Sequence, residues 1–179
     1  MKATGIVRRI DELGRIVIPK EIRRTLRIRE GDPLEIYTDR EGGIILRKYS
    51  PIGELASFAK DFADSLSAAI GATALVCDRD TVLAASGEFK RDYMDRPVSS
   101  ALEEKMSGRT AEVLSDAQTI PLITGEDTAL TTSQAIAPIS MDGQPIGAVV
   151  LITRGGTLGQ PASAAAQSAA SFLGKQMEQ

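Results

Sequence analysis

The sequence predicts an α+β fold in two domains, a small basic domain followed by a larger acidic one. The first observation is charge: residues 1–50 carry 12 Lys and Arg against 8 Asp and Glu, whereas residues 51–179 carry 9 against 16. The second is periodicity, because short strands surround a basic helix in the first part and strands lie between two long helical stretches in the second. The third is Pro51, which ends one element and suits the start of a helix. We therefore expect domains at 1–50 and 56–179, joined by a junction at 51–55.

The first element of the basic domain is a strand, loop and second strand in the segment that runs from Thr4 to Ile28. The first strand includes Arg8 and Arg9, whose side chains point to opposite faces because side chains alternate along a strand. Asp11–Gly14 supplies a tight loop, and Arg15 follows it at the start of a second short strand.

The helix that follows is predicted to present a basic face. It begins at Pro19, whose missing N–H suits the first helical position, and no further Pro or Gly occurs before Gly31. At about 100° per residue, Ile22 and Leu26 lie opposite four cations that share about a third of a turn, namely Lys20, Arg23, Arg24 and Arg27. Such a face is either ordinary solvated surface or a surface that binds a polyanion. Its combination with the strand arginines in one short unit favours nucleic-acid binding.

A β-hairpin completes the basic domain as a ββαββ unit. Apolar and polar residues alternate in Pro33–Asp39, Arg40–Gly43 supplies a turn, and Ile44–Tyr49 returns. So short a unit, with no disulfide or metal, rarely closes a stable core alone, and we expect an obligate homodimer through residues 1–50. The apolar side chains available to its core are Ile6, Val7, Ile10, Ile16, Val17, Ile18, Ile22, Leu26, Ile28, Leu34, Ile36, Ile44, Ile45 and Leu46.

The acidic domain begins with a helix over Leu55–Ile70, which ends at Gly71. Apolar residues such as Leu55, Phe58 and Leu66 recur along it at helical spacing, and this stripe serves either core packing or a helix–helix interface between chains. After it we expect, in order, strands at Thr73–Asp78 and Thr81–Ala85, a helix at Pro97–Met106, a short strand at Ala111–Leu114, a hairpin of Gln134–Ser140 with Pro145–Thr153, and a last helix at Pro161–Gln176.

Composition argues against an enzyme, a cofactor and a metal site. The chain has no histidine, and Cys77 is its only cysteine, so we expect a buried, inert thiol in a protein of the reducing cytoplasm. Asp78 and Asp80 fit turn carboxylates better than a metal pair. The polar stretch Gln118–Ser133 is expected to be a surface loop, although a loop there can also cover a pocket. No apolar run is long enough to cross a bilayer, so we expect no membrane partner.

The basic domain resembles the AbrB-like transition-state regulators of spore-forming bacteria. The likeness rests on TGIVRRIDELGRIVIPKEIRRTL, followed by GDPLEIY and IILRKY, and covers residues 1–50; SPIGELASFAKDFADSL and the closing FLGKQMEQ are similar to a member that regulates forespore genes. The resemblance implies a swapped-hairpin β-barrel dimer that binds double-stranded, A/T-rich promoter DNA as activator and repressor, through shape more than a base code. It further implies DNA contacts from Arg8, Arg15, Arg23 and Arg24, with support from Lys2, Arg9, Lys20 and Arg27.

The acidic domain resembles a GAF domain, an α/β sandwich in which terminal helices frame the sheet. The resemblance covers residues 55–178 and rests on the element order and the late Pro-Ile-turn-Pro-Ile-Gly-Ala-Val-Val hairpin. It implies a small-molecule effector of unknown identity and pairing through the terminal helices, hence a homotetramer of two DNA-binding dimers. The alternative is an antitoxin-like protein-interaction module of swapped-hairpin fold. The patterned, globular-looking sequence that replaces an antitoxin's disordered tail argues against it.

Overall fold

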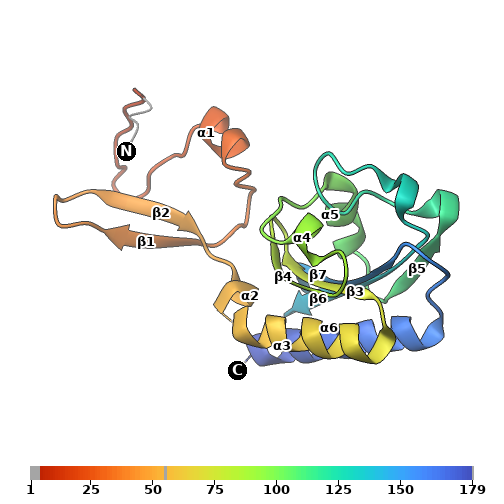
Figure 1. Ribbon diagram of the computed structural model, residues 1–179. Coiled ribbons are helices and arrows are strands. Elements are labelled where there is room, and N and C mark those ends of the chain that lie inside the picture. Colours follow the sequence, from red (N-terminus) through yellow and green to blue (C-terminus); the bar gives the residue numbers. More distant parts are fainter. Residues whose placement is uncertain (1–4, 55, 179) are drawn as a thin grey trace. The chain divides into compact units, whose positions relative to one another are not determined.

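The computed structural model describes residues 5–54 and 56–178 and shows two compact units that separate between Tyr49 and Ser50 (Figure 1). The mixture of helices and antiparallel strands in the described residues confirms the α+β class that the sequence predicts.

The N-terminal unit contains a short helix and a two-stranded antiparallel hairpin. Helix α1 spans Lys20–Thr25, strand β1 spans Leu34–Thr38, and strand β2 spans Ile44–Lys48. The turn between the strands is held by the Asp39 carboxylate, which accepts the backbone N–H of Gly43 at 2.6 Å. The predicted hairpin is therefore confirmed.

The two strands predicted before the helix are not formed in a single copy of the chain. Residues 5–18 contain no strand, and their backbone is organised by one turn, in which the N–H of Asp11 donates to the carbonyl of Arg15 at 3.0 Å. A strand is stable only where a neighbouring strand takes up its backbone hydrogen bonds. One copy places no neighbouring strand there, so the prediction of local strands is wrong for the isolated chain.

Helix α1 is also shorter than predicted, because its last turn closes early. Arg27 adopts the left-handed conformation with φ 53°, and its N–H donates to the carbonyl of Arg24 at 3.3 Å. The N–H of Ile28 donates to the carbonyl of Arg23 at 2.7 Å. Together these bonds form a Schellman motif, which ends a helix. Helix α1 therefore ends at Thr25, and Arg27 lies beyond it rather than on its face.

The C-terminal unit is built on an antiparallel sheet whose strand order, within the described residues, is β4-β3-β7-β6-β5. Strands β6 and β7 form the longest hairpin, as the sequence predicts. Strand β3 lies between β4 and β7, and its residues up to Cys77 are buried. The strands are β3 (Thr73–Asp78), β4 (Val82–Ser86), β5 (Glu112–Ser115), β6 (Ser133–Met141) and β7 (Gln144–Thr153).

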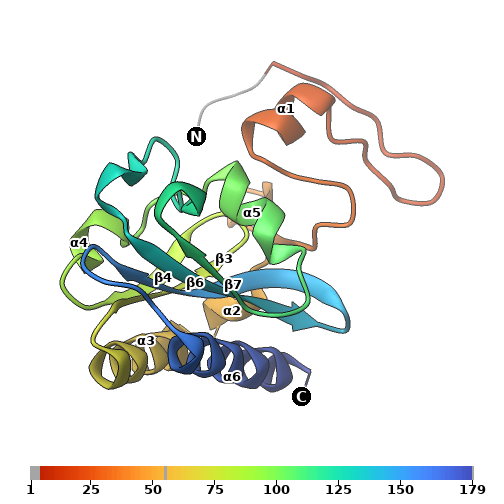
Figure 2. The same ribbon diagram turned by 90° about the vertical axis from the view of Figure 1, so that its right-hand side faces the viewer.

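Helices cover both faces of this sheet. Figure 2 shows the two long helices side by side along one face and short helices on the other. A Cβ atom at Gly174 of the last helix would collide with the carbonyl oxygen of Ser140, so this helix packs directly against the backbone of β6. The helices are α2 (Pro51–Glu54), α3 (Ala56–Ile70) and α6 (Gln160–Met177) on the first face, α4 (Lys90–Tyr93) and α5 (Ser100–Met106) on the second, with 3₁₀ turns η1 (Asp116–Gln118) and η2 (Thr128–Leu130).

The apolar stripe of helix α3 divides between the core and the surface. Ala59, Ala63 and Leu66 are buried against the sheet, whereas the side chain of Phe58 remains 47% exposed. Leu55, which belongs to the predicted stripe, lies outside the described residues. The structure thus supports core packing for part of the stripe and leaves its outer part open to solvent.

Two predictions about the second face need correction. Helix α5 begins at Ser100 rather than at Pro97, because Pro97 and Val98 form β-bridges and Ser99 caps the helix by accepting the N–H of Leu102 at 3.0 Å. Strand-like pairing thus outweighs the helical pattern at these positions.

The stretch 118–133 is more than a polar surface loop. Leu122 and Ile123 are buried, and the Glu126 carboxylate accepts their backbone N–H groups and the hydroxyl of Tyr93. These bonds tie the loop to helix α4 and make it part of the second core.

Candidate nucleic-acid interface

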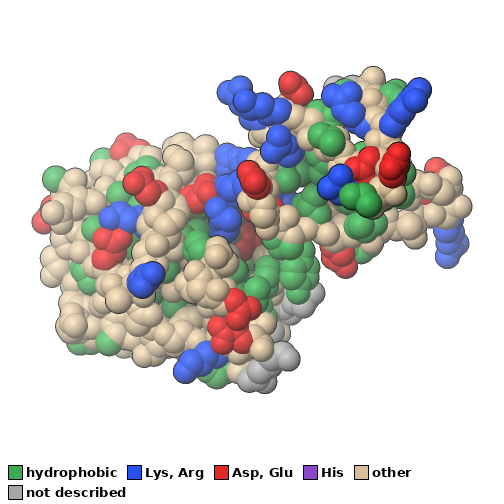
Figure 3. All heavy atoms as spheres, turned by 180° about the vertical axis from the view of Figure 1, so that it is seen from behind, with side chains coloured by type: hydrophobic (Ala, Val, Ile, Leu, Met, Phe, Trp, Pro, Cys, Tyr) green, Lys and Arg blue, Asp and Glu red, His purple; other side chains and the backbone are tan. Residues whose placement is uncertain are grey.

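The predicted contact residues lie mostly at the surface of the N-terminal unit. Figure 3 shows Lys and Arg side chains projecting from this unit, with hydrophobic side chains between them. Arg23 is the one member of the predicted set that is half-buried, and Lys2 lies outside the described residues. The exposed members are Arg8, Arg9, Arg15, Lys20, Arg24 and Arg27.

Arg15 is oriented by a loop that Asp11 organises. The Asp11 carboxylate accepts the backbone N–H of Leu13 at 3.0 Å, the backbone N–H of Arg15 at 2.8 Å, and the Nε of Arg15 at 2.8 Å. These bonds, chiefly the one from the Arg15 backbone, lower the pKa of Asp11 below its ordinary value. This role of Asp11 was not predicted from the sequence, although an Asp that opens a tight loop is a frequent Asx-turn signal.

Arg23 is held by the chain segment that precedes its helix. Its Nε donates to the carbonyl of Ile18 at 3.2 Å, which leaves the terminal nitrogens of the guanidinium for other partners. An Arg8 terminal nitrogen donates to the carbonyl of Val7 at 3.2 Å. Of the predicted contact residues that the structure describes, Arg9, Lys20 and Arg24 form no ion pair or side-chain hydrogen bond with other described residues.

The structure therefore places only some of the four predicted cations on the exposed face of helix α1. Lys20 and Arg24 are exposed on α1, Arg23 is drawn back to Ile18, and Arg27 follows the helix. Each guanidinium presents a planar fork of donors that fits phosphate oxygens or a guanine edge. The arrangement suits a polyanion better than a small neutral ligand.

The same unit exposes an unusual amount of apolar surface. Val7 is 85% exposed, Val17 71%, Ile44 69% and Ile36 67%. Apart from Pro19, the described residues of this unit include none that is buried. A soluble monomer rarely leaves so many large apolar side chains in water, so this surface marks an interaction site. Further exposed members are Ile6, Ile10, Leu13, Ile16, Leu26 and Leu46.

In the C-terminal unit, Cys77 and Asp78 take the structural roles that the sequence predicts. Cys77 is fully buried and donates to the carbonyl of Ala148, and burial raises the pKa of its thiol to about 12, which confirms the predicted inert side chain. The Asp78 carboxylate accepts the N–H groups of Asp80 and Thr81, as a turn carboxylate does. Across residues 5–54 and 56–178, no three acidic or cysteine side chains gather as a metal site.

The helices of the described residues are all too short or too polar to span a membrane.

Comparisons with known proteins match the basic and the acidic parts of the chain to two different family models. Residues 54–178 match the family model described as the stage V sporulation protein T C-terminal, transcription factor. Residues 7–54 match the model described as antidote-toxin recognition MazE, bacterial antitoxin. The chain is 69% identical over 51 residues to the transition state regulatory protein AbrB of Bacillus subtilis strain 168, a match that covers 28% of this chain and 52% of AbrB.

The fold of the C-terminal unit is that of a GAF domain. The PixJ GAF domain of Thermosynechococcus elongatus superposes with a TM-score of 0.57 at 11% identity, over 73% of this chain and 89% of that one. The full chain is 54% identical over 179 residues to the stage V sporulation protein T of Bacillus subtilis strain 168, and the match covers 100% of both proteins. With an AbrB-like N-terminal domain and a GAF-like C-terminal domain, the chain belongs to the stage V sporulation protein T family of transcription factors.

Proposed function

We propose that this transcription factor binds double-stranded DNA through its N-terminal unit and acts as activator and repressor of forespore genes. The observation that carries the proposal is the coincidence, in one short unit, of exposed arginines with exposed apolar side chains. The family membership supports sporulation as the setting, and a regulator of this kind acts in the cytoplasm, at the nucleoid.

The DNA contacts come from the loop, the helix and the segment before them. Arg8, Arg15, Arg23 and Arg24 make direct contacts, while Arg9, Lys20 and Arg27 add charge at the edge. Most of these contacts go to phosphates and therefore set affinity and register. Selectivity for A/T-rich promoters then arises from groove shape and deformability.

A second copy of the chain completes the N-terminal unit. Apolar side chains such as Val7 and Val17 need a cover, and the backbone of residues 5–18 needs neighbouring strands. An interleaved homodimer through residues 1–50 supplies both at once. It also repeats the arginines about a two-fold axis, so that two half-sites are contacted together.

The C-terminal unit joins two such dimers and responds to a small-molecule effector. Phe58 and Phe172 remain 47% and 42% exposed on the helical face, and the ring of Phe172 lies 5.1 Å from that of Phe62. Pairing of these faces between two chains buries the rings and yields a tetramer with two DNA-binding heads. Such bivalence raises apparent affinity by about 10² to 10⁴ where both heads engage.

Equilibrium binding across a salt series tests the DNA-binding part of the proposal. The full chain is titrated with an A/T-rich promoter duplex by fluorescence anisotropy from about 50 to 200 mM salt. With about 6 to 10 phosphate contacts, affinity should fall by about 10³ to 10⁵ over this range, because each contact releases counterions. The Arg23→Ala/Arg24→Ala variant should bind more weakly and with a shallower slope.

The matched control removes two charges elsewhere. Lys90 and Arg91 are both exposed on α4 of the C-terminal unit, so Lys90→Ala/Arg91→Ala changes the net charge equally. If the control loses affinity as much as Arg23→Ala/Arg24→Ala does, or if neither variant changes the slope, the N-terminal cations are ordinary solvated surface and the proposal fails.

The antitoxin alternative is less well supported, despite the family model that matches residues 7–54. Antitoxin modules of this fold neutralise their toxin through a disordered tail. Here residues 56–178 contain a sheet with two buried cores. These residues therefore form a folded domain rather than an extended tail.

A further inference from the structure

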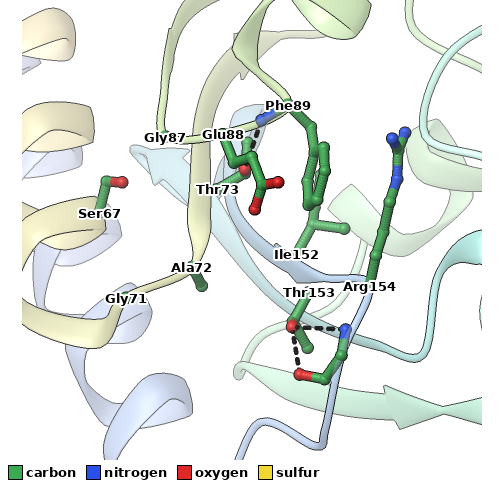
Figure 4. A pocket seen from close by; sticks show the side chains of 11 residues that line it. Ser67, Gly71, Ala72, Thr73, Gly87, Glu88, Phe89, Ile152, Thr153 and Arg154 are labelled. Carbon is green, nitrogen blue, oxygen red and sulfur yellow. Dashed lines mark hydrogen bonds between the residues drawn. The ribbon is translucent and has the colours of Figure 1, made fainter.

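A cavity opens in the C-terminal unit where helix α3 ends and strand β3 begins. It encloses about 540 Å³, which lies within the range of small-molecule sites. Figure 4 shows its walls: Ser67 comes from α3, Gly71–Thr73 from the connection to β3, Gly87–Phe89 from the segment before α4, and Ile152–Gly155 from the end of β7. This place is distinct from the second core, which the protein's own side chains fill.

One side of the cavity is an aromatic ring that is already held in place. The guanidinium carbon of Arg154 lies 4.1 Å from the centre of the Phe89 ring, and a terminal nitrogen of Arg154 bonds Asp92 at 2.9 Å. In Figure 4, Phe89 stands between Arg154 and Glu88. The stacking fixes the ring, and the ion pair with Asp92 offsets the charge of Arg154.

The polar side chains on the remaining walls can all accept hydrogen bonds. Glu88 is exposed and forms no ion pair within the described part of the chain. The Thr73 hydroxyl oxygen accepts the N–H of Phe89 at 3.1 Å, and the Ser67 hydroxyl lies across the cavity from Glu88. Thus a carboxylate and hydroxyl oxygens line the wall beside the ring.

The end of helix α3 adds further negative potential. Ser67 belongs to its last turn, Gly71 follows the helix with φ 73°, and the last turn contains no Lys or Arg. The C-terminus of a helix carries a partial negative charge and carbonyl groups that lack intrahelical partners. Because Asp92 pairs with Arg154, Glu88 is the charged residue of the lining that has no ion pair with another described residue, and it lies beside an aromatic ring.

We propose that this cavity binds a small ligand through a protonated primary amine, received by the Glu88 carboxylate beside Phe89. An ammonium group has three donors, which match Glu88, the Ser67 hydroxyl and the end of α3, and its charge is attracted to an aromatic face. The site gives the effector response proposed above a location and a ligand class, and in this respect it rests on the proposed function. Diamines and amino acids share the required ammonium group.

Binding is measured on the full chain without DNA, so a failure of DNA binding leaves the result intact. The probes are putrescine, which carries two ammonium groups, L-alanine, which adds a carboxylate, and 1,4-butanediol, the uncharged analogue of putrescine. Calorimetry gives the affinity, and amide NMR shifts of Gly71, Gly87 and Gly155 report the location. We expect saturable putrescine binding that Glu88→Gln weakens at least about tenfold, as for loss of one charged hydrogen-bond partner.

Glu104→Gln is the matched control, because Glu104 is an exposed carboxylate on α5, outside the cavity. It should leave putrescine binding unchanged, and both variants should unfold at the temperature of the parent. If L-alanine binds as tightly as putrescine, the natural ligand is an amino acid. If only putrescine binds, the natural ligand is a diamine. Absence of saturable binding by either amine, equal binding of butanediol, or equal effects of the two Glu variants would overturn the proposal.

Discussion

At the scale of single residues, Arg27 combines two properties that a substitution can separate. Its left-handed backbone closes helix α1, a conformation that costs a non-glycine residue about 1 kcal/mol or more, and its side chain adds positive charge to the proposed DNA-binding surface. Substitution by glycine removes both the backbone strain and the positive charge. Substitution by alanine removes the charge and keeps the strain.

We therefore predict that Arg27→Gly is more stable than Arg27→Ala by about 1 kcal/mol, while both bind DNA more weakly than the parent and to the same extent. Chemical denaturation followed by circular dichroism measures the stability difference, and anisotropy measures DNA binding. Equal stabilities would mean that position 27 leaves the left-handed region in the assembled protein. Parental DNA affinity in both variants would remove Arg27 from the interface.

At the scale of elements, the prediction succeeded where pairing is completed within one chain. The hairpin of β1 with β2 follows from alternating residues around a Gly-containing turn, that of β6 with β7 follows from two apolar stretches around Asp142 and Gly143, and β3 matches its predicted bounds. Prediction failed for residues 5–18, because an alternating pattern shows that a strand is possible without showing which chain supplies its neighbour.

For the site residues, too, the sequence predicts what depends on local spacing and misses what depends on contacts formed in the folded chain. Charge and helical spacing indicated the arginines, but Asp11's hold on Arg15 and Arg23's bond to Ile18 depend on loop geometry. Glu88, Phe89 and Arg154 were not predicted as a cavity, because the end of β7 meets the segment before α4 only in the folded domain. No sequence spacing encodes that meeting.

The exposed segment before the helix yields a prediction of its own. Val17→Asp adds a carboxylate to a side chain that is 71% exposed in one copy, which a monomer would tolerate within about 0.5 kcal/mol. Buried between two copies, the same carboxylate would lack a partner and cost several kcal/mol. We expect analytical ultracentrifugation to show loss of the assembly through the N-terminal unit, with dimer affinity at least about 100-fold weaker.

Leu130→Glu provides the comparison, because Leu130 is 68% exposed in the 3₁₀ turn η2 of the C-terminal unit. It should leave the sedimentation profile unchanged. A Val17→Asp protein that sediments like the parent would refute the obligate dimer and leave the apolar surface of the N-terminal unit to a different partner.

At the scale of the whole molecule, the division of charge assigns the two halves to different tasks. The basic half approaches phosphate, while the acidic half, with 9 Lys and Arg against 16 Asp and Glu, is repelled by it. This division supports the proposal that DNA engages the N-terminal units and that the C-terminal units join them. The chain between the halves then determines how well two heads reach two sites together.

That junction is anchored by Ser50. Its hydroxyl donates to the Asp78 carboxylate at 2.7 Å and accepts the N–H of Gly53 at 3.2 Å, so it caps α2 and ties it to the end of β3. The other end of β3 is Thr73, in the wall of the cavity, so one buried strand connects the proposed ligand site with the junction.

Ser50→Ala should lower the stability of helix α2 at the junction by about 1 kcal/mol, the usual effect of a lost helix cap. It should leave both binding sites intact. Affinity for a duplex with one site should then remain parental, because a single head binds as before. Affinity for a duplex with two sites should fall, because a looser junction reduces the preorganisation that lets the second head engage. Ser57→Ala, at an exposed position of α3, is the control and should change neither affinity. Anisotropy with the two duplexes gives the ratio of the affinity for two sites to the affinity for one site. A parental ratio in Ser50→Ala would show that the anchor does not govern bivalent binding, and the junction would then be only a tether.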